Sequence, residues 1–162
     1  MIEILKLAMT LKKNVCVYTC GSEISKFLYG RIIFIDNEFF ALYMLTPNGE
    51  NDGILVKKIS CITYVEMDGQ YDEKMKKLCP NFDDLISKTP IDFENGNALF
   101  SIMLEALRTE KPISVELLDS GVDSVIGQVT AVNEKICTVR QIDEYGCDDG
   151  IASVSYTHLT LP

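Results

Sequence analysis

The sequence predicts a mainly β protein with short helices, organised as two tandem small barrels of five strands, each preceded by a helix. Three observations lead to this prediction. The chain of 162 residues is 47% hydrophobic and 24% charged, which is enough to bury one sizeable core or two small ones. It repeats itself after about 97 residues, the distance from Gly30 to Gly127. Within each repeat, apolar residues alternate along short segments separated by turn residues, as is typical of strands.

The repeat extends without a gap over the middle of each copy. The matched polar and turn positions are Gly30 and Gly127, Gly49 and Gly146, Asp52 and Asp149, and Gly53 and Gly150. The apolar positions agree as well, because Ile32, Ile35, Phe39 and Leu42 fall on Val129, Val132, Ile136 and Val139. We therefore expect the two copies to bury the same face of the same strands.

Each copy is expected to begin with an amphipathic helix, because a shift of 98 places Ile4, Leu5, Ala8 and Met9 on Ile102, Met103, Ala106 and Leu107. Strands follow in the first copy at about 14–20, 27–36, 39–46, 52–58 and 60–66. The residues from Asp36 to Glu38 form a tight turn between the second and third strands. Five short antiparallel strands are predicted to curl into a barrel, which leaves fewer open edges than a flat sheet.

The predicted boundaries place the first barrel and a closing helix at residues 1–79, a linker at 80–96 and the second barrel at 97–162. The closing helix is expected over 71–78, with Tyr71, Met75 and Leu78 on one side and a Glu73–Lys77 pair on the other. Pro80 ends this helix. Within the linker, residues 82–86 are expected to pack as a helical turn.

The segment 30–39, which reads GRIIFIDNEF, resembles the first motif of the Sm-like (LSm/Hfq) barrels, of a bacterial type. The second copy, 127–136, keeps the glycine and the apolar steps but has Asn133 where the first has Asp36. SH3-like barrels show similar spacing. The resemblance implies a barrel and self-association through strand edges. It does not carry over an RNA-binding residue, since Phe40 and Cys137 stand where the RNA-binding members have Asn.

The end of the second copy departs from the repeat. Where the first copy continues with a strand at 59–65, the second runs from Ser155 to Pro162 with a sequence that resembles translated sequencing-adapter DNA. We expect residues from about 154 to be a non-native tail and the second barrel to be truncated. Thr157, Leu159 and Leu161 alternate, so this tail is also able to take the place of the last strand.

Charge separates the two halves. Residues 1–79 carry ten basic and ten acidic residues, whereas residues 80–162 carry five and fourteen, so the second half holds the whole net charge of −9. Such a chain gains little from attraction to phosphates, which argues against non-specific binding of nucleic acid. No apolar run approaches the roughly 18 residues of a membrane span and no signal peptide pattern is present. We expect a cytoplasmic protein without a membrane partner.

The side chains needed for catalysis are scarce, because His158 is the only histidine and there is no tryptophan. The six cysteines lack metal-ligand spacing, and we expect mostly buried free thiols with no metal and no cofactor. The leading hypothesis is a non-enzymatic intracellular module for protein interaction or assembly, which binds an unidentified protein or a second copy of itself. The alternative is RNA binding by the first barrel through Arg31, Tyr43, Lys57 and Lys58. Edge lysines that discourage aggregation are the preferred explanation of the last two.

The repeated Gly-x-x-Asp-Gly segment has two explanations. It is either a turn that both copies need for folding, or a loop at the barrel rim that faces a ligand, and repetition favours the turn. We therefore expect structural turn residues at Gly30, Asp36, Gly49, Asp52, Gly53, Gly127, Gly146, Asp149 and Gly150.

Overall fold

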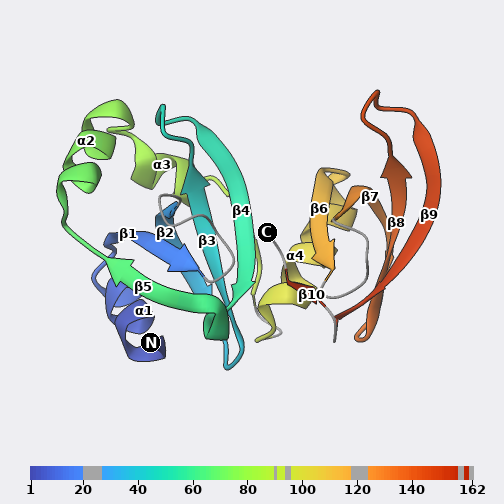
Figure 1. Cartoon of the computed structure of the whole chain (residues 1–162), viewed down its shortest axis with the longest axis horizontal. Coiled ribbons are helices and arrows are strands. Elements are labelled where there is room, and N and C mark those ends of the chain that lie inside the picture. The colour runs from blue at the N-terminus through green and yellow to red at the C-terminus, as the bar shows by residue number, and fades with distance from the viewer. Residues whose placement is uncertain (20–26, 90, 94–95, 118–123, 157–158, 161–162) are drawn as a thin grey trace. The chain divides into compact units, whose positions relative to one another are not determined.

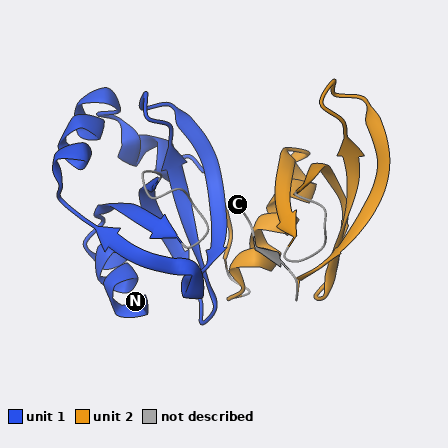
Figure 2. Ribbon diagram, in the orientation of Figure 1, with its two compact units in different colours: residues 1–90 blue, residues 91–162 orange. Residues whose placement is uncertain are grey.

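The computed structural model describes residues 1–19, 27–89, 91–93, 96–117, 124–156 and the backbone of 159–160. The chain divides into two compact units, Met1–Pro90 and Ile91–Pro162, which are coloured separately in Figure 2. Strands hold 46% of the chain and helices 29%, so the prediction of a mainly β fold with short helices is confirmed.

Unit 1 is a five-stranded antiparallel sheet with helices at both ends of its sequence (Figure 1). The strands lie in the order β4-β3-β2-β1-β5, so each of β1 to β4 pairs with its neighbour in sequence and β5 returns to pair with β1. Its elements are α1 (Ile2–Thr10), β1 (Asn14–Thr19), β2 (Leu28–Ile35), β3 (Phe39–Leu45), β4 (Asn51–Lys58), the 3-10 turn η1 (Ile59–Cys61), β5 (Ile62–Glu66), α2 (Gln70–Leu78) and α3 (Phe82–Ser87).

Unit 2 repeats this sheet. Its order β10-β6-β7-β8-β9 is that of unit 1 listed from the opposite edge, and its two-residue last strand takes the place of β5. The backbone of the expected tail thus occupies the position of the last strand. The elements are α4 (Ala98–Thr109), β6 (Pro112–Leu117), β7 (Ser124–Val132), β8 (Ile136–Ile142), β9 (Asp148–Ser155) and β10 (Leu159–Thr160).

The expected barrels are wrong, because both sheets are open. Among the described strands, β4 pairs only with β3 and β5 only with β1, so no ladder joins the two edges of unit 1. The edges of unit 2, β9 and β10, are likewise separate. Barrel closure is one way to protect an edge, but charged side chains are another, and Lys57 and Lys58 lie on the edge strand β4.

Helices cover both faces of the unit 1 sheet (Figure 1). On one face, Leu5 and Ala8 of α1 are fully buried against alternate strand residues such as Val15 and Phe40. On the other face, which we call the outer face, Met75 of α2 and residues of α3 pack against the intervening positions. Because side chains alternate between the two faces along each strand, each face of the sheet carries its own apolar layer.

The segment expected to link the units contains an ordered helix. Phe82 of α3 is buried and packs on the outer face of unit 1, as does the partly buried Leu85. The packed side of α2 agrees with the expectation at Tyr71 and Met75, but Asp72 and the adjoining Cys79 are also buried and Leu78 is exposed. Glu73 pairs with Lys76 at 3.0 Å, and its expected pair with Lys77 is not formed.

Two glycines bring strands unusually close at equivalent places. A Cβ on Gly30 would lie 2.0 Å from the carbonyl oxygen of Tyr43, and one on Gly127 would lie 2.0 Å from that of Arg140. Only glycine fits such an approach. Both sheets also shift register just after this point, between Ile32 and Phe34 in unit 1 and at the matching step in unit 2. The two copies therefore bend their second strand in the same way.

The turn after this strand is closed by the same bonds in both copies. An oxygen of Asp36 accepts hydrogen bonds from the backbone N–H groups of Glu38 and Phe39, at 2.8 and 2.7 Å. An oxygen of Asn133 accepts the matching two bonds in unit 2, at 2.9 and 3.0 Å. The turn requires an acceptor oxygen rather than a charge, which explains why Asn replaces Asp.

Candidate functional site

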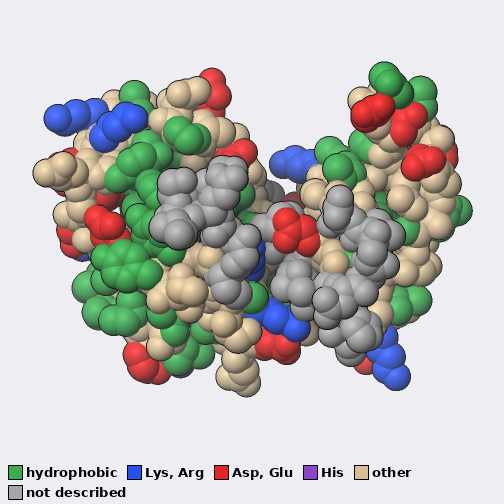
Figure 3. Space-filling view, in the orientation of Figure 1, with side chains coloured by type: hydrophobic (Ala, Val, Ile, Leu, Met, Phe, Trp, Pro, Cys, Tyr) green, Lys and Arg blue, Asp and Glu red, His purple; other side chains and the backbone are tan. Residues whose placement is uncertain are grey.

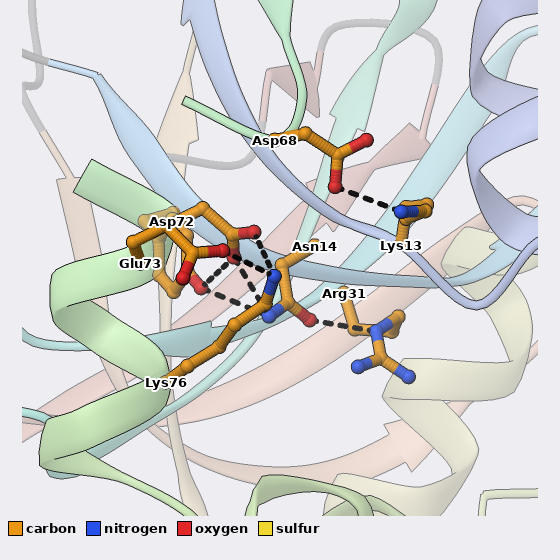
Figure 4. A network of polar contacts seen from close by, with 8 residues as sticks. Lys13, Asn14, Arg31, Asp68, Asp72, Glu73 and Lys76 are labelled. Atoms are coloured by element: carbon orange, nitrogen blue, oxygen red, sulfur yellow. Dashed lines mark hydrogen bonds and ion pairs between the residues drawn. The ribbon is translucent and has the colours of Figure 1, made fainter. Parts of the chain in front are cut away.

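A network of polar side chains lies beneath α2 on the outer face of unit 1 (Figure 4). The Asn14 Nδ2 donates to Asp72 Oδ1 at 3.0 Å and to the Tyr29 hydroxyl at 2.9 Å. The Tyr29 hydroxyl in turn donates to Asp72 Oδ1 at 2.7 Å. These three side chains are buried, and Lys76 Nζ closes the network from the solvent side at 2.8 Å from Asp72 Oδ2.

The electrostatics of Asp72 follow from these contacts. Burial raises the pKa of this carboxyl, but hydrogen bonds from Lys76, Tyr29 and Asn14 outweigh the burial and leave the pKa below its usual value. Burial and the bond to Asp72 raise the pKa of Tyr29, whose hydroxyl therefore stays protonated. The hydrogen bonds to Asp72 and Glu73 raise the pKa of Lys76. The network is thus held in one protonation state around neutral pH.

Arg31 extends the network to α3. Its Nε donates to Asn14 Oδ1 at 2.8 Å, its Nη1 lies 2.9 Å from Asp83 Oδ1, and its guanidinium lies over the ring of Phe82. A pocket of about 170 Å³ lies between the sheet and the helices at this place, and these side chains line it together with Tyr29, Leu45, Met75, Lys76, Cys79 and Pro80. Because its polar side chains already bond one another, we interpret the network as the clasp that fixes α2 and α3 on the sheet.

The four residues predicted to contact RNA do not form one accessible patch. Arg31 is committed to the clasp and Tyr43 is buried against Phe82. Lys57 pairs with Phe40 and Lys58 with Phe39 across the β3–β4 ladder, so the two lysines point to opposite faces of the sheet. RNA contact through these residues stays a prediction.

The outer face of unit 2 is the counterpart of the face beneath α2 and α3. We define it by Ile126, Gln128, Arg140 and Ile151, which match Tyr29, Arg31, Tyr43 and Ile54 of unit 1. Ile126 is 45% and Ile151 75% exposed, whereas Tyr29 is only 4% exposed. Gln128, Arg140 and Ile151 lie side by side across three strands, and Arg140 donates to the Gln128 amide oxygen at 2.9 Å. No described element of unit 2 covers this face.

The clasp has no counterpart in unit 2. At the places of Asn14, Tyr29 and Arg31 the second copy has Pro112, Ile126 and Gln128. A carboxylate above this face would therefore lose the amide and hydroxyl donors that hold Asp72 in unit 1. The same sheet thus presents a covered outer face with a buried polar network in one copy and, among the described residues, an exposed face without that network in the other.

The turn between β8 and β9 carries the most exposed aromatic side chain among the described residues, Tyr145 at 82%. Around it lie Asp143, Glu144, Asp148 and Asp149, and acidic and apolar side chains gather at this tip in Figure 3. The matching segment of unit 1, residues 46–52, contains only two acidic residues and has Asn48 in place of the tyrosine. We call residues 143–149 the acidic tip.

Two of the predicted turn glycines, Gly49 and Gly146, have similar backbone angles but different neighbours. Gly49 and Gly146 have φ of 83° and 79°. A Cβ on Gly49 would meet the side chain of Leu78 at 2.8 Å, whereas one on Gly146 would meet nothing within 4 Å. The end of α2 therefore reaches the β3–β4 tip of unit 1, and the acidic tip of unit 2 has no such neighbour among the described residues.

The remaining turn residues lie on exposed backbone. Gly53 and Gly150 have φ of 84° and 92° and open space at the Cβ position. Asp52 and Asp149 precede them and are exposed. An oxygen of Asn51 accepts from the Gly53 N–H at 2.9 Å, and Asp148 makes the same bond to Gly150 at 2.9 Å.

The cysteines are free thiols where the structure describes them, and Cys20 lies outside the described residues. Cys16, Cys79 and Cys137 are buried, Cys61 is partly buried and Cys147 is exposed. Burial, and to a smaller extent the charges of Glu66 and Asp72, raise the pKa of Cys16 to about 12. Burial raises the pKa of Cys137 to about 11. Within the described ranges, no three Cys, Asp, Glu or His side chains are grouped to hold a metal ion.

The sequence reasoning missed the clasp. One signal was present, because Asp72 lies three residues before Met75 and therefore on the side of α2 that packs. Asn14 directly precedes a run of apolar strand residues, where a polar side chain is easily taken for a strand boundary. Nothing local indicates that these two residues, 58 apart in sequence, would meet.

No protein-family model, no curated protein and no solved structure matches the chain. Together with the open sheets, this overturns the Sm-like assignment made from residues 30–39. The motif indicates a bent strand followed by a polar turn. Both features are present here, at Gly30 and Asp36, in a sheet that is not closed into a barrel. None of the described helices is long and apolar enough to cross a membrane.

Proposed function

We propose that this chain is a non-enzymatic protein-interaction module and that the outer face of unit 2 is its binding surface. The observation that carries the proposal is the comparison of the two copies. Among the described residues, nothing in unit 2 covers the face that α2 and α3 cover in unit 1, and this face bears the exposed Ile126 and Ile151. Burying an exposed isoleucine on association contributes about 25 cal/mol for each Å² of apolar surface removed from water.

The polar residues of this face support the same function. Arg140 lies between the two isoleucines in the strand order, with Gln128 beside it. Isolated exposed apolar residues are common on protein surfaces and indicate little. Arginine is enriched at interface centres, and Arg140 here has Gln128 on one side and Ile151 on the other.

Site-specific photo-crosslinking tests the proposal. A benzoylphenylalanine replaces Ile151 in the full chain, which is then illuminated in an extract of the cells that encode it. The matched control carries the same group at Ile54, the equivalent position beneath the helices of unit 1. We expect a discrete protein adduct at position 151, either another protein or a second copy of the chain, that is absent at position 54.

The contrary outcomes are distinct. Adducts to RNA at either position would favour the alternative of RNA binding. The same protein adducts at positions 151 and 54 would show that the outer face of unit 2 is not the surface used. No adduct at position 151 in a folded chain would overturn the proposal.

A further inference from the structure

We infer that α1 is a self-association surface, through which two copies of the chain pair their α1 helices in an antiparallel arrangement. The surface consists of three exposed apolar side chains, Ile4, Leu7 and Leu11, which we call the α1 stripe. It belongs to unit 1 and not to the outer face of unit 2, so the inference does not rest on the proposed function. It follows from the exposure of the stripe, from the equivalent helix of unit 2 and from the charges at the two ends of α1.

The α1 stripe lies along one side of the helix. Its three side chains are 42%, 47% and 55% exposed, in chain order. The backbone N–H of Leu11 donates to the Leu7 carbonyl oxygen at 2.9 Å, so helical spacing continues through Leu11. With about 3.6 residues per turn, the three side chains fall within an arc of about 60°. This arc is about a quarter of a turn from Leu5 and Ala8, which are fully buried where α1 lies against the sheet (Figure 1).

The second copy shows that the sheet does not need the leucines of the stripe. The two fully buried positions of α1 stay apolar and buried in α4, as Met103 and Ala106. Of the three stripe positions only the first is kept, as Ile102, and the two leucines are replaced by Glu105 and Thr109. The same helix therefore packs on the same kind of sheet with polar residues at these places. Packing within unit 1 does not explain why they are leucine.

The spacing of the stripe suits a second helix. Single exposed apolar residues are common on protein surfaces, but three on one side of a helix form a contiguous patch. Apolar residues at i, i+3 and i+7 form the seam along which two helices pack. A two-fold axis through the middle of the stripe sets Ile4 of each copy opposite Leu11 of the other, with the two Leu7 side chains adjacent at the centre. The stripe is therefore complementary to a second copy of itself.

The charges at the ends of α1 select the antiparallel direction. Glu3 in the first turn is exposed and makes only a long contact to Lys6, at 3.8 Å. Lys12, just after the helix, is exposed and forms no ion pair with any described residue, whereas Lys13 bonds Asp68 at 2.8 Å. The two-fold pair brings Glu3 of each copy alongside Lys12 of the other and sets the helix dipoles in opposite directions. A parallel pair would bring like charges together.

The same charges disfavour a lipid surface as the occupant. The chain has a net charge of −9, and Glu3 flanks the stripe, so the phosphates of anionic lipid would repel both. The interface between two helices of nine residues is small. We therefore expect a weak dimer, with a dissociation constant of about 10 to 500 µM.

Sedimentation equilibrium of the full chain tests the inference. Between about 5 µM and 1 mM, a range that brackets such a dimer, the mean mass should rise from 18.2 kDa towards twice that value. Leu7→Glu/Leu11→Thr, which introduces the residues of α4, should weaken the dimer at least about tenfold. Leu104→Ser, at an exposed leucine of α4, is the matched control and should change nothing. Protection of the buried Cys16 thiol from labelling reports that unit 1 is folded in each variant.

Charge exchange tests the direction of pairing. Glu3→Lys should bring lysine against lysine at both ends of the antiparallel pair, and Lys12→Glu should bring glutamate against glutamate. Each variant should weaken the dimer about fivefold. An equimolar mixture of the two variants should restore association, because each mixed pair has opposite charges at both ends. A parallel pair predicts no loss in either single variant.

The inference is overturned by a mass of 18.2 kDa at every concentration, by a dimer that Leu7→Glu/Leu11→Thr leaves intact, or by a mixture of charge variants that associates no better than its components. A monomer that binds phosphatidylcholine vesicles through the two leucines would assign the stripe to a membrane instead. If the leucine variant exposes Cys16, the charge variants decide alone. The crosslink at position 151 reports a different surface, so its presence or absence leaves the inference unchanged.

Discussion

In unit 1 both faces of the five-stranded sheet are covered by helices, whereas in unit 2 the described helix α4 leaves the outer face exposed. The residues that shape the sheet are the same in kind, with a close-approach glycine and an acceptor oxygen in the turn of each copy. The residues that face outward differ, with Asn14 and Tyr29 replaced by Pro112 and Ile126. The two copies therefore share the geometry of the sheet but differ in the chemistry of its outer face.

The largest effect is expected where the copies are most alike. Gly30→Ala and Gly127→Ala each place a Cβ about 2.0 Å from a backbone oxygen, so each should destabilise its own unit by about 3 kcal/mol. Urea unfolding with pulsed labelling of the buried thiols measures this, because Cys16 reports unit 1 and Cys137 reports unit 2. Gly150→Ala, at an open position with φ of 92°, is the control and should cost only the roughly 1 kcal/mol of its positive φ. An effect in only one copy would break the equivalence of the two strands.

A somewhat smaller effect should be confined to unit 1. Asp72→Asn removes the charge that accepts bonds from Tyr29, Asn14 and Lys76, and should cost about 2 kcal/mol. Labelling of Cys16 at lower urea, with Cys137 unchanged, is the expected result. Asp149→Asn, at an exposed position near the start of β9, should be silent, and a similar loss there would contradict the clasp.

The clasp also predicts a pH dependence. The folded pKa of Asp72 lies below the value of 3.8 expected in an unfolded chain, so its ionised form stabilises unit 1 above that pH. This stability is lost as the pH falls through the folded pKa. We expect the difference in unfolding midpoint between the natural chain and Asp72→Asn to shrink below about pH 4. A difference that persists in acid would assign the effect to packing.

Replacing the glycines at the two hairpin tips should lower the free energy of unfolding by different amounts. Both Gly49→Ala and Gly146→Ala force a positive φ on alanine, at about 1 kcal/mol each. Gly49→Ala also meets Leu78 and should cost about 1 kcal/mol more. Urea midpoints of the two variants, read by thiol labelling, test this, and equal costs would argue that α2 does not press on the tip.

The smallest effect is expected at the outer faces. Ile151→Ser should change the stability of unit 2 by less than about 0.5 kcal/mol, because this side chain is 75% exposed. The matched Ile54→Ser should cost about 1 kcal/mol, because Ile54 is partly buried against the outer layer of unit 1. Thermal unfolding of both variants measures the difference. A large loss for Ile151→Ser would mean that this residue serves folding rather than binding.

The sequence predicted the strands well because their information is local. Alternation of apolar residues placed the third strand at 39–46, and the structure has it at Phe39–Leu45. Edge pairing is not local, since closure depends on whether β4 meets β5, and no residue pattern within either strand decides that. The barrel was therefore wrong although the order of elements was right.

The candidate sites show the same limit. Arg31 and Tyr43 were singled out as accessible contacts, yet the helices that cover them come from residues 70–87, which were expected to close the barrel and link the units. The exposure of Ile151 likewise depends on the absence of an equivalent cover among the described residues of unit 2. Only the comparison of the two copies in three dimensions identifies this face.

The shared hairpin turn has a consequence for the history of the chain. Asp36 and Asn133 close their turns with the same two bonds, and Gly30 and Gly127 make the same close approach six residues earlier. A gene segment that encodes both the close-approach glycine and the acceptor side chain of the turn yields, on duplication, a second copy that forms the same hairpin. The outward residues of either copy can then change without loss of the hairpin.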